Sequence, residues 1–343
     1  MKHNKNVVSL FLVAALAACG GSSGSNNGTS SGTSPGATPT PSPTPPPSGN
    51  LLFFDNFEYA ADRNNASAAT AFLAAGWSAV KSIQTSGGYN GYVYTANSIP
   101  GFAGNFPGGG SRVLVLESLG GSLGGQTDFY LQLGQPESAS SEGFIPGDVW
   151  FQFWIYIANT PEQPSLIDNR NKFIYPCNAA YPCTAGNAKW LMSMGAYTYE
   201  PLNQQVFGRP SAEGAFLMLN GDGRYTAAAP ENEPKLGQTN IGEHIAANRW
   251  TLVKIHIDTS GPSGRYEAWM KPRGGQWAKV AEWIDGTTPN FTWQLAPEQR
   301  GGHRGFRMPT TMGEAPLERP RYDAWIYMDD FAMAGSESAL PSY

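Results

Sequence analysis

Short segments in which apolar and polar side chains alternate recur along this chain, and they constrain its fold more than any other feature. Two clear examples are DVWFQFWIYI at residues 148–157 and TLVKIHID at residues 251–258. Because successive strand residues point to opposite faces of a sheet, alternation with period two predicts strands with one buried face. Gly, Pro, Asn and Asp separate the segments, and the only helix expected is short and Ala-rich, over residues 66–76. The sequence therefore predicts an all-β antiparallel sandwich or jelly roll.

The chain begins like an exported protein. A short basic start precedes an apolar run that ends at Ala18 and is too short to span a bilayer as a helix. The LAAC at residues 16–19 resembles the lipobox of bacterial lipoproteins, where the signal is cut before a cysteine that carries the lipid. The resemblance implies a signal peptide at residues 1–18, lipid on Cys19 and attachment to the cell envelope, at the outer membrane because Gly20 rather than Asp follows. The alternative is an ordinary cleaved signal, with Cys19 lost or left free.

A low-complexity segment separates this start from the rest of the chain. After Cys19, residues up to 50 are almost entirely Gly, Ser, Thr, Asn, Ala and Pro, with no charged or large apolar side chain. Such a segment has nothing to bury, so residues 19–50 are predicted to be a disordered linker that carries the lipid. Residues 51–343 are expected to form one β-domain. The net charge is −5 and no basic stripe is visible, so nucleic acid is not an expected partner.

Cysteine usage agrees with export. Besides Cys19, the chain has Cys177 and Cys183, which bracket a Pro-containing loop in YPCNAAYPCT. In an oxidising compartment a disulfide between them is the simplest account. Metal binding by the pair would need further soft ligands, and none is near in sequence.

The alternation also assigns strand faces. On residues 149–157 and 253–257 one face carries Val, Ile and Phe, which we expect to be core, while the other combines aromatic rings with polar groups. Rings stack on sugars, amides bond hydroxyls and cations pair with acidic sugars, so the second face suits a polysaccharide. Large amphipathic side chains beneath long loops are an equally good explanation. The predicted substrate-binding residues are Trp150, Gln152, Trp154, Trp250, Arg265, Glu267, Trp269 and Lys271.

Four segments carry a resemblance to a known fold family. The early FFDNFEY, the central DVWFQFWIYI, then RWTLVKIHIDTSGPSGRYEAWMKP and the closing YDAWIYMDDFAMA follow the order of concanavalin A-like jelly rolls. They are most similar to the secreted, heparin lyase I-like polysaccharide lyases. The chain lacks the E-x-D-x-x-E strand of laminarinase-type glucanases, whose retaining chemistry needs two carboxyls about 5 to 5.5 Å apart. It also lacks the R-S-E-L-R and Y-F-K-x-G motifs of jelly-roll alginate lyases. The resemblance implies a polysaccharide lyase, and fold alone does not settle it.

A lyase assigns roles to a few residues. β-Elimination from a uronate needs a group that neutralises the carboxylate, a base for the C5 proton and an acid for the leaving oxygen. His256 lies on the polar face of a strand, and we expect it to act as base or neutraliser; for each candidate the alternative is a solvated strand face. The expected catalytic residues are His256, Lys254, Tyr156, Arg170 and Lys172.

The two ends of the predicted domain are acidic. Many jelly-roll carbohydrate modules hold a structural calcium between their first and last strands, and clustered carboxylates supply the oxygen ligands that Ca²⁺ prefers. The expected ligands are Asp55, Glu58, Asp329 and Asp330. The alternative is that these residues only mark exposed strand ends.

Three functions remain open from the sequence. A lyase for an anionic, uronic-acid glycan predicts His256 beside a cation in a groove. A noncatalytic glycan-binding lipoprotein predicts an aromatic platform without a proton-transfer group. A structural envelope protein predicts an apolar patch and no groove.

Overall fold

The computed structural model describes residues 50–77, 79–82, 91–118, 129–134, 145–158, 171–177, 191–195, 198–199, 205–206, 214–220, 245–284, 300–303, 305–309 and 324–343. The expected signal peptide, the linker, Cys19, Arg170 and Cys183 lie outside these residues. No helix among the described residues is both long and apolar enough for a membrane span.

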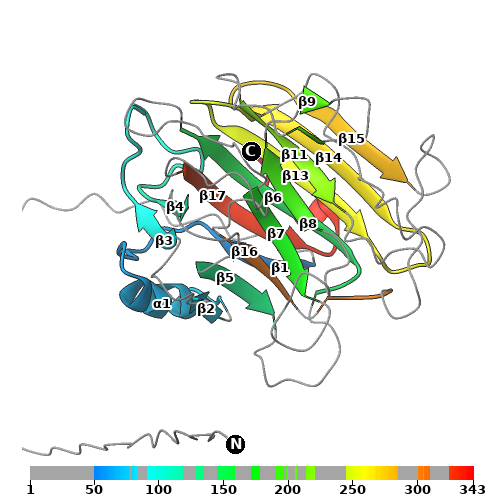
Figure 1. Ribbon diagram of the computed structural model, residues 1–343, viewed down its shortest axis with the longest axis horizontal. Helices are drawn as coiled ribbons and strands as arrows, with labels where there is room; N and C mark the ends of the chain where they lie inside the picture. Colours follow the sequence, from blue (N-terminus) through cyan, green and yellow to red (C-terminus); the bar gives the residue numbers. More distant parts are fainter. Residues whose placement is uncertain are drawn as a thin grey trace, which may run out of the picture. The chain divides into compact units, whose positions relative to one another are not determined.

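Two antiparallel sheets form the fold (Figure 1). The larger sheet has eight strands in the order β15-β14-β13-β6-β17-β4-β3, with β1 also paired to β17. Its strands are β1 (Leu51–Asp55), β3 (Gly91–Ala96), β4 (Val113–Ser118), β6 (Asp148–Ile157), β13 (Thr251–Asp258), β14 (Arg265–Pro272), β15 (Ala278–Ile284) and β17 (Ala324–Ala334).

The second sheet has seven strands in the order β12-β11-β8-β7-β16-β5-β2. They are β2 (Ala79–Ser82), β5 (Phe129–Gly134), β7 (Asn171–Cys177), β8 (Leu191–Gly195), β11 (Gly214–Asn220), β12 (Ile245–Ala246) and β16 (Gly305–Pro309). A separate two-stranded ribbon pairs β9 (Thr198–Tyr199) with β10 (Gln205–Val206). Helix α1 (Asn65–Ala74) is followed by Gly76 at a φ of 100°, and a short 3-10 helix, η3, spans Glu337–Ala339.

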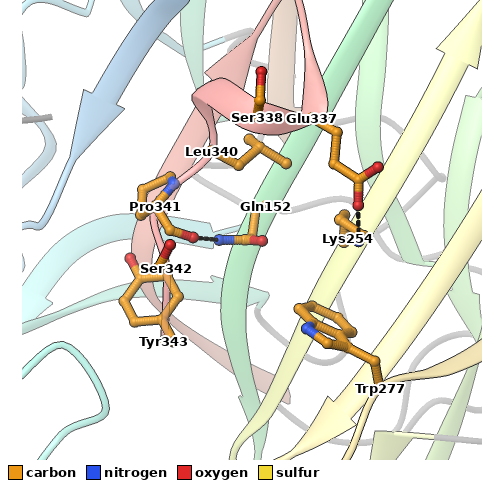
Figure 2. Close-up of a pocket in the computed structure, with 9 residues that line it drawn as sticks. All are labelled: Gln152, Lys254, Trp277, Glu337, Ser338, Leu340, Pro341, Ser342 and Tyr343. Carbon is orange, nitrogen blue, oxygen red and sulfur yellow. Dashed lines mark hydrogen bonds and ion pairs between the residues drawn. The ribbon is translucent and has the colours of Figure 1, made fainter. Parts of the chain in front are cut away.

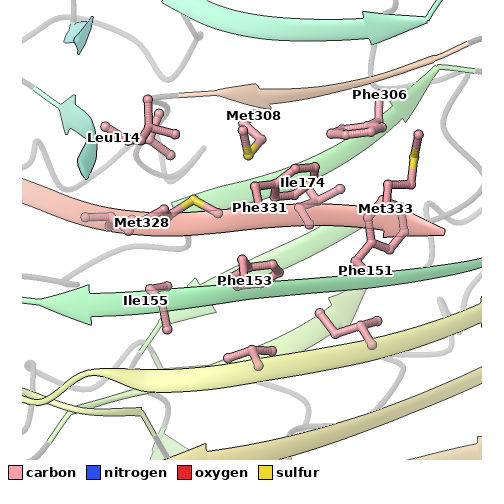
Figure 3. Close-up of a cluster of buried hydrophobic side chains, with 14 of the residues drawn as sticks. Leu114, Phe151, Phe153, Ile155, Ile174, Phe306, Met308, Met328, Phe331 and Met333 are labelled. Carbon is pink, nitrogen blue, oxygen red and sulfur yellow. The ribbon is translucent and has the colours of Figure 1, made fainter. Parts of the chain in front are cut away.

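The main core contains the side chains that the alternation assigned to it (Figure 3). Every apolar residue of the predicted inner face of β6 and β13 is buried there, and β16 and β17 add Phe, Met and Ile side chains. Burial of such side chains is the dominant favourable contribution to folding. The predicted fold class and the short helix are confirmed. The core positions taken from the alternation are Val149, Phe151, Phe153, Ile155, Ile157, Val253, Ile255 and Ile257.

The outer face of the larger sheet is partly covered as well. A second apolar cluster joins rings of β6, Leu252 of β13 and Trp250 just before it to Ile99 and Phe106, which belong to the segment between β3 and β4. The C-terminal segment, residues 335–343, lies over the same face: Leu340 packs with Ala332 and Ala334 of β17. The part of this face that carries β13, β14 and β15 keeps partly exposed rings and charges.

Candidate functional site

Strand register gathers the polar side chains of the outer face into rows. Lys254 of β13 lies between Gln152 of β6 and Trp269 of β14. Two residues along, His256 lies between Trp150 and Glu267. Because residues that face each other across neighbouring strands project to the same side, each row forms one continuous surface.

Tryptophan rings and lysine ammonium groups form a connected surface over these rows, which we call the Trp–Lys strip. The rings of Trp150 and Trp269 stack at 5.6 Å between centroids. The Lys254 ammonium lies 4.8 Å from the ring centroids of both Trp269 and Trp277. The ammonium group of Lys271 lies 6.0 Å from the ring centroid of Trp277, and that of Lys279 lies 5.3 Å from the ring centroid of Trp269. The strip comprises Trp150, Trp269, Trp277, Lys254, Lys271 and Lys279.

His256 is held on three sides. Its Nε2 lies 2.8 Å from Asp148 Oδ1 and its Nδ1 lies 3.1 Å from Glu267 Oε2. Its ring stacks on Trp150 with centroids 4.1 Å apart and planes 7° apart. A histidine donates from both nitrogens only as the imidazolium. In this arrangement neither nitrogen is open to a substrate proton, so the geometry disfavours His256 as the base, and that role stays a prediction.

Glu267 is the buried anion of the strip. Besides His256, Arg265 Nε donates to it at 2.6 Å and Lys279 Nζ pairs with it at 2.6 Å. Burial alone would raise the pKa of Glu267, but the hydrogen bonds from Arg265, Lys279 and His256 outweigh it and lower that pKa to about 2. Glu267 therefore orders the cations around it, and its own carboxylate is fully engaged.

A pocket of about 300 Å³ opens beside Lys254 (Figure 2). The C-terminal segment forms one wall, where Gln152 donates to the carbonyl of Pro341 at 2.7 Å and Lys254 pairs with Glu337. Trp277 stands across the pocket from this wall and is 38% exposed. Aromatic, amide, hydroxyl and charged groups thus converge on one concave space, as in small-molecule sites.

Three aromatic side chains predicted to face an open groove are buried instead. Trp250 and Tyr156 are 1% exposed and Trp154 is 4% exposed. They pack with Phe102 and Phe106, and Trp154 also contacts the ring of Tyr343. The expectation that Trp154 and Trp250 offer open rings to a sugar is wrong, because loop and tail residues cover them.

The expected catalytic residues are not brought together. Lys254 and His256 share the outer face of the larger sheet, and Tyr156 lies on that face but is buried under Phe102, where desolvation raises the pKa of its hydroxyl. Lys172 belongs to β7 of the other sheet, and Arg170 lies outside the described residues. Cys177 ends β7 and Cys183 is outside the described residues, so the disulfide stays a prediction.

Asp55 serves the fold rather than a metal. Its carboxylate accepts hydrogen bonds from Phe57 N at 2.7 Å, Tyr59 Oη at 2.8 Å and Trp77 Nε1 at 2.6 Å. Burial raises the pKa of Asp55, and these donors oppose the shift. With its oxygens engaged, Asp55 is unsuited to bind calcium.

The other expected calcium ligands surround the glycine-rich segment 108–112. Glu58 accepts hydrogen bonds from Ser111 N and Arg112 N at 2.8 and 2.9 Å, and Asp329 accepts one from Gly108 N at 3.1 Å. Burial and the charge of Asp330 raise the pKa of Asp329 to about 8, and burial raises that of Asp330 to about 6. Among the described residues, however, no three His, Cys, Asp or Glu side chains are grouped to hold a metal. As placed, the ligands do not fit a calcium site.

Several residues of the site were missed from the sequence. Asp148, Trp277, Lys279 and Glu337 all contact predicted site residues. Lys279 carried a signal, because it begins KVAEWI at residues 279–284, a strand-like segment that closely follows RYEAWMKP at residues 265–272. Glu337 carried none, because the C-terminal segment has no alternation that would place it on a sheet face.

Neither the family models nor the curated proteins contain a match to the chain. Among solved structures, the chain is similar to the PL-14 alginate lyase from Aplysia kurodai. The two share 11% identity over 82% of this chain and 98% of that chain, with a TM-score of 0.45. The alginate lyase vAL-1 from Chlorella virus gives 11% identity, 81% and 99% coverage and a TM-score of 0.39. The VIP36 exoplasmic/lumenal domain in its Ca²⁺/Man3GlcNAc-bound form gives 10% identity, 68% and 81% coverage and a TM-score of 0.35. At such scores the function has to be argued from this chain's own residues.

Proposed function

We propose that this protein binds an anionic polysaccharide through the Trp–Lys strip and cleaves it as a polysaccharide lyase. The observation that carries the binding proposal is the contiguity of the strip, in which one ammonium group, that of Lys254, lies within 4.8 Å of two tryptophan rings. Flat rings offer stacking surfaces to sugar rings, and ammonium groups pair with sugar carboxylates or sulfates.

The distribution of exposed apolar side chains supports a ligand site over a flat protein-contact patch. Among the described residues, the exposed large hydrophobic side chains are Leu73, Trp277 and Tyr343. Two of them line the pocket beside Lys254. A protein interface would instead expose a continuous apolar area.

The elimination step is proposed at the strip itself. Lys254 lines the pocket, so its ammonium group is suited to neutralise the carboxylate of a bound uronate. A base then removes the C5 proton, the C4–O bond breaks, a C4–C5 double bond forms and the leaving oxygen is protonated.

Anchoring belongs to the same proposal. The LAAC sequence at residues 16–19 supports lipidation of Cys19, and the Gly/Ser/Thr/Pro composition of the linker supports a tethered domain. We propose that the protein acts at the cell envelope, at the outer membrane. Globomycin, which blocks lipoprotein signal cleavage, would then cause accumulation of the unprocessed chain.

The two parts of the function are separable by experiment. Purified residues 51–343 are incubated with a panel of uronic-acid polymers, and the unsaturated product is followed by its ultraviolet absorbance. Trp277→Ala is expected to raise KM, because it removes a ring of the strip, whereas Lys254→Ala is expected to lower kcat, because it removes the charge that neutralises the uronate carboxylate. Affinity electrophoresis in gels that contain each polymer measures binding by itself. Binding without product would leave a noncatalytic glycan-binding protein, and no binding to any polymer would refute both parts.

A further inference from the structure

We infer that Lys254, Trp269 and Trp277 form a subsite for the carboxylate of a uronic acid residue, and that Glu337 occupies this subsite when no glycan is bound. The inference rests on the proposed binding function and names the group that the strip recognises.

The first argument is the burial of Lys254. Its side chain is only 11% exposed, yet it reaches the pocket at the end of the row Gln152–Lys254–Trp269. A desolvated ammonium needs an anionic partner. Glu337 supplies that carboxylate, and it comes from the C-terminal segment rather than from a strand of the sheet.

The second argument is that the Glu337 carboxylate can leave. Its side chain is 53% exposed, and it is the first residue of the three-residue helix η3, whose N-cap Ser336 makes no capping hydrogen bond with its side chain. Because more than half of the Glu337 side chain is exposed, solvent screens its pair with Lys254, which we take to be worth on the order of 1 kcal/mol. A sugar carboxylate in the same place would restore the pair with Lys254 and would add ring stacking on Trp277.

The third argument is that the rest of the segment is fixed. Gln152 holds the carbonyl of Pro341, Lys271 Nζ donates to the carbonyl of Tyr343 at 2.8 Å, and Leu340 is buried. Rotation of the Glu337 side chain therefore opens the subsite and leaves the pocket wall in place. The hydroxyl groups of Ser338 and Ser342 line the same pocket and are suited to bond sugar hydroxyls.

The test compares variants on one anionic and one neutral polymer. Glu337→Gln removes the competing carboxylate, so its affinity for polyglucuronate should rise by about fivefold, the equivalent of 1 kcal/mol. Lys254→Met should weaken that affinity, and neither change should alter retention by neutral dextran. Asp62→Asn is the matched control, because it removes the same charge at an exposed position outside the pocket and should behave like the wild type.

The outcomes separate this inference from the proposed function. If the wild type binds polyglucuronate and Glu337→Gln binds it no more tightly, the inference is wrong while the binding function stands. If Glu337→Gln and Asp62→Asn gain equally, the effect is one of net charge, and the subsite is again refuted. If no variant binds, both proposals fail. Lys254→Arg keeps the positive charge and should retain binding. If Lys254→Met loses binding while Lys254→Arg retains it, the loss comes from the missing charge and not from damage to the fold.

Discussion

Replacing Glu267 by glutamine should destabilise the protein by about 3 kcal/mol at neutral pH. Glu267 is buried and is bonded by His256, Arg265 and Lys279. Its pKa falls from an ordinary value of 4.5 to about 2, and one pKa unit corresponds to about 1.36 kcal/mol, so the shift amounts to about 3 kcal/mol. The glutamine amide would keep the size of the side chain and lose the negative charge that its three partners share.

The pH dependence follows from the direction of the shift. Because the pKa of Glu267 is lower in the folded protein than in the unfolded chain, the stabilisation is complete above pH 4.5 and is lost as the pH falls towards about 2. The free energy of unfolding, measured with urea, should therefore differ between the wild type and Glu267→Gln at pH 7, and the difference should be clearly smaller at pH 3 and vanish only as the pH approaches 2.

A neighbouring carboxylate provides the control. Glu282 is the register partner of Glu267 on β15, is exposed and also pairs with Lys279. Glu282→Gln should cost less than about 1 kcal/mol, as exposed pairs do. If Glu267→Gln is as stable as Glu282→Gln, or if its cost is the same at pH 3 as at pH 7, the assigned role of Glu267 in ordering the strip is wrong.

Three further outcomes are expected. The pKa of Asp329 is raised to about 8, so its contribution to stability should decline as the pH rises from about 4 to 8, and Asp329→Asn should flatten this decline in urea titrations at several pH values. The calcium ion predicted from the sequence near Glu58, Asp329 and Asp330 does not fit the present arrangement, so EDTA and added Ca²⁺ should leave the melting temperature unchanged; a rise with Ca²⁺ would contradict this. Trp154→Ala should cost about 3 to 5 kcal/mol because its ring is buried, whereas Trp277→Ala should change the melting temperature little; equal losses would contradict the different burial of the two rings.

The sequence predicted the sheet faces correctly and predicted their accessibility incorrectly. Period two assigns Val253 and Ile255 to one side and Lys254 and His256 to the other whatever the rest of the chain does, because it depends only on strand geometry. Whether the second side is open depends on what packs over it. Phe106 and the C-terminal segment cover Trp154 and Trp250. The sequence of neither covering segment has a local pattern that would predict this contact.

Cross-strand neighbours could be predicted from the sequence only where the two strands belong to one hairpin. The turn between β13 and β14 joins two adjacent strands, so the pairing of His256 with Glu267 could be anticipated from the sequence. The pairing of β13 with β6, which brings Asp148 and Trp150 to His256, joins segments about a hundred residues apart and is set by the topology of the whole sheet. The engaged state of His256 depends on both pairings.

The strand that leads into the domain and the strands that carry the Trp–Lys strip belong to the same sheet. β1 pairs with β17, β17 with β6, and β6 with β13. If the chain were pulled ahead of Leu51 while a polymer was bound at the strip, the force would be transmitted from strand to strand through the backbone hydrogen bonds of this sheet. The seven-stranded sheet would carry none of that force. The β1–β17 pair should therefore separate before the apolar core between the sheets is disrupted.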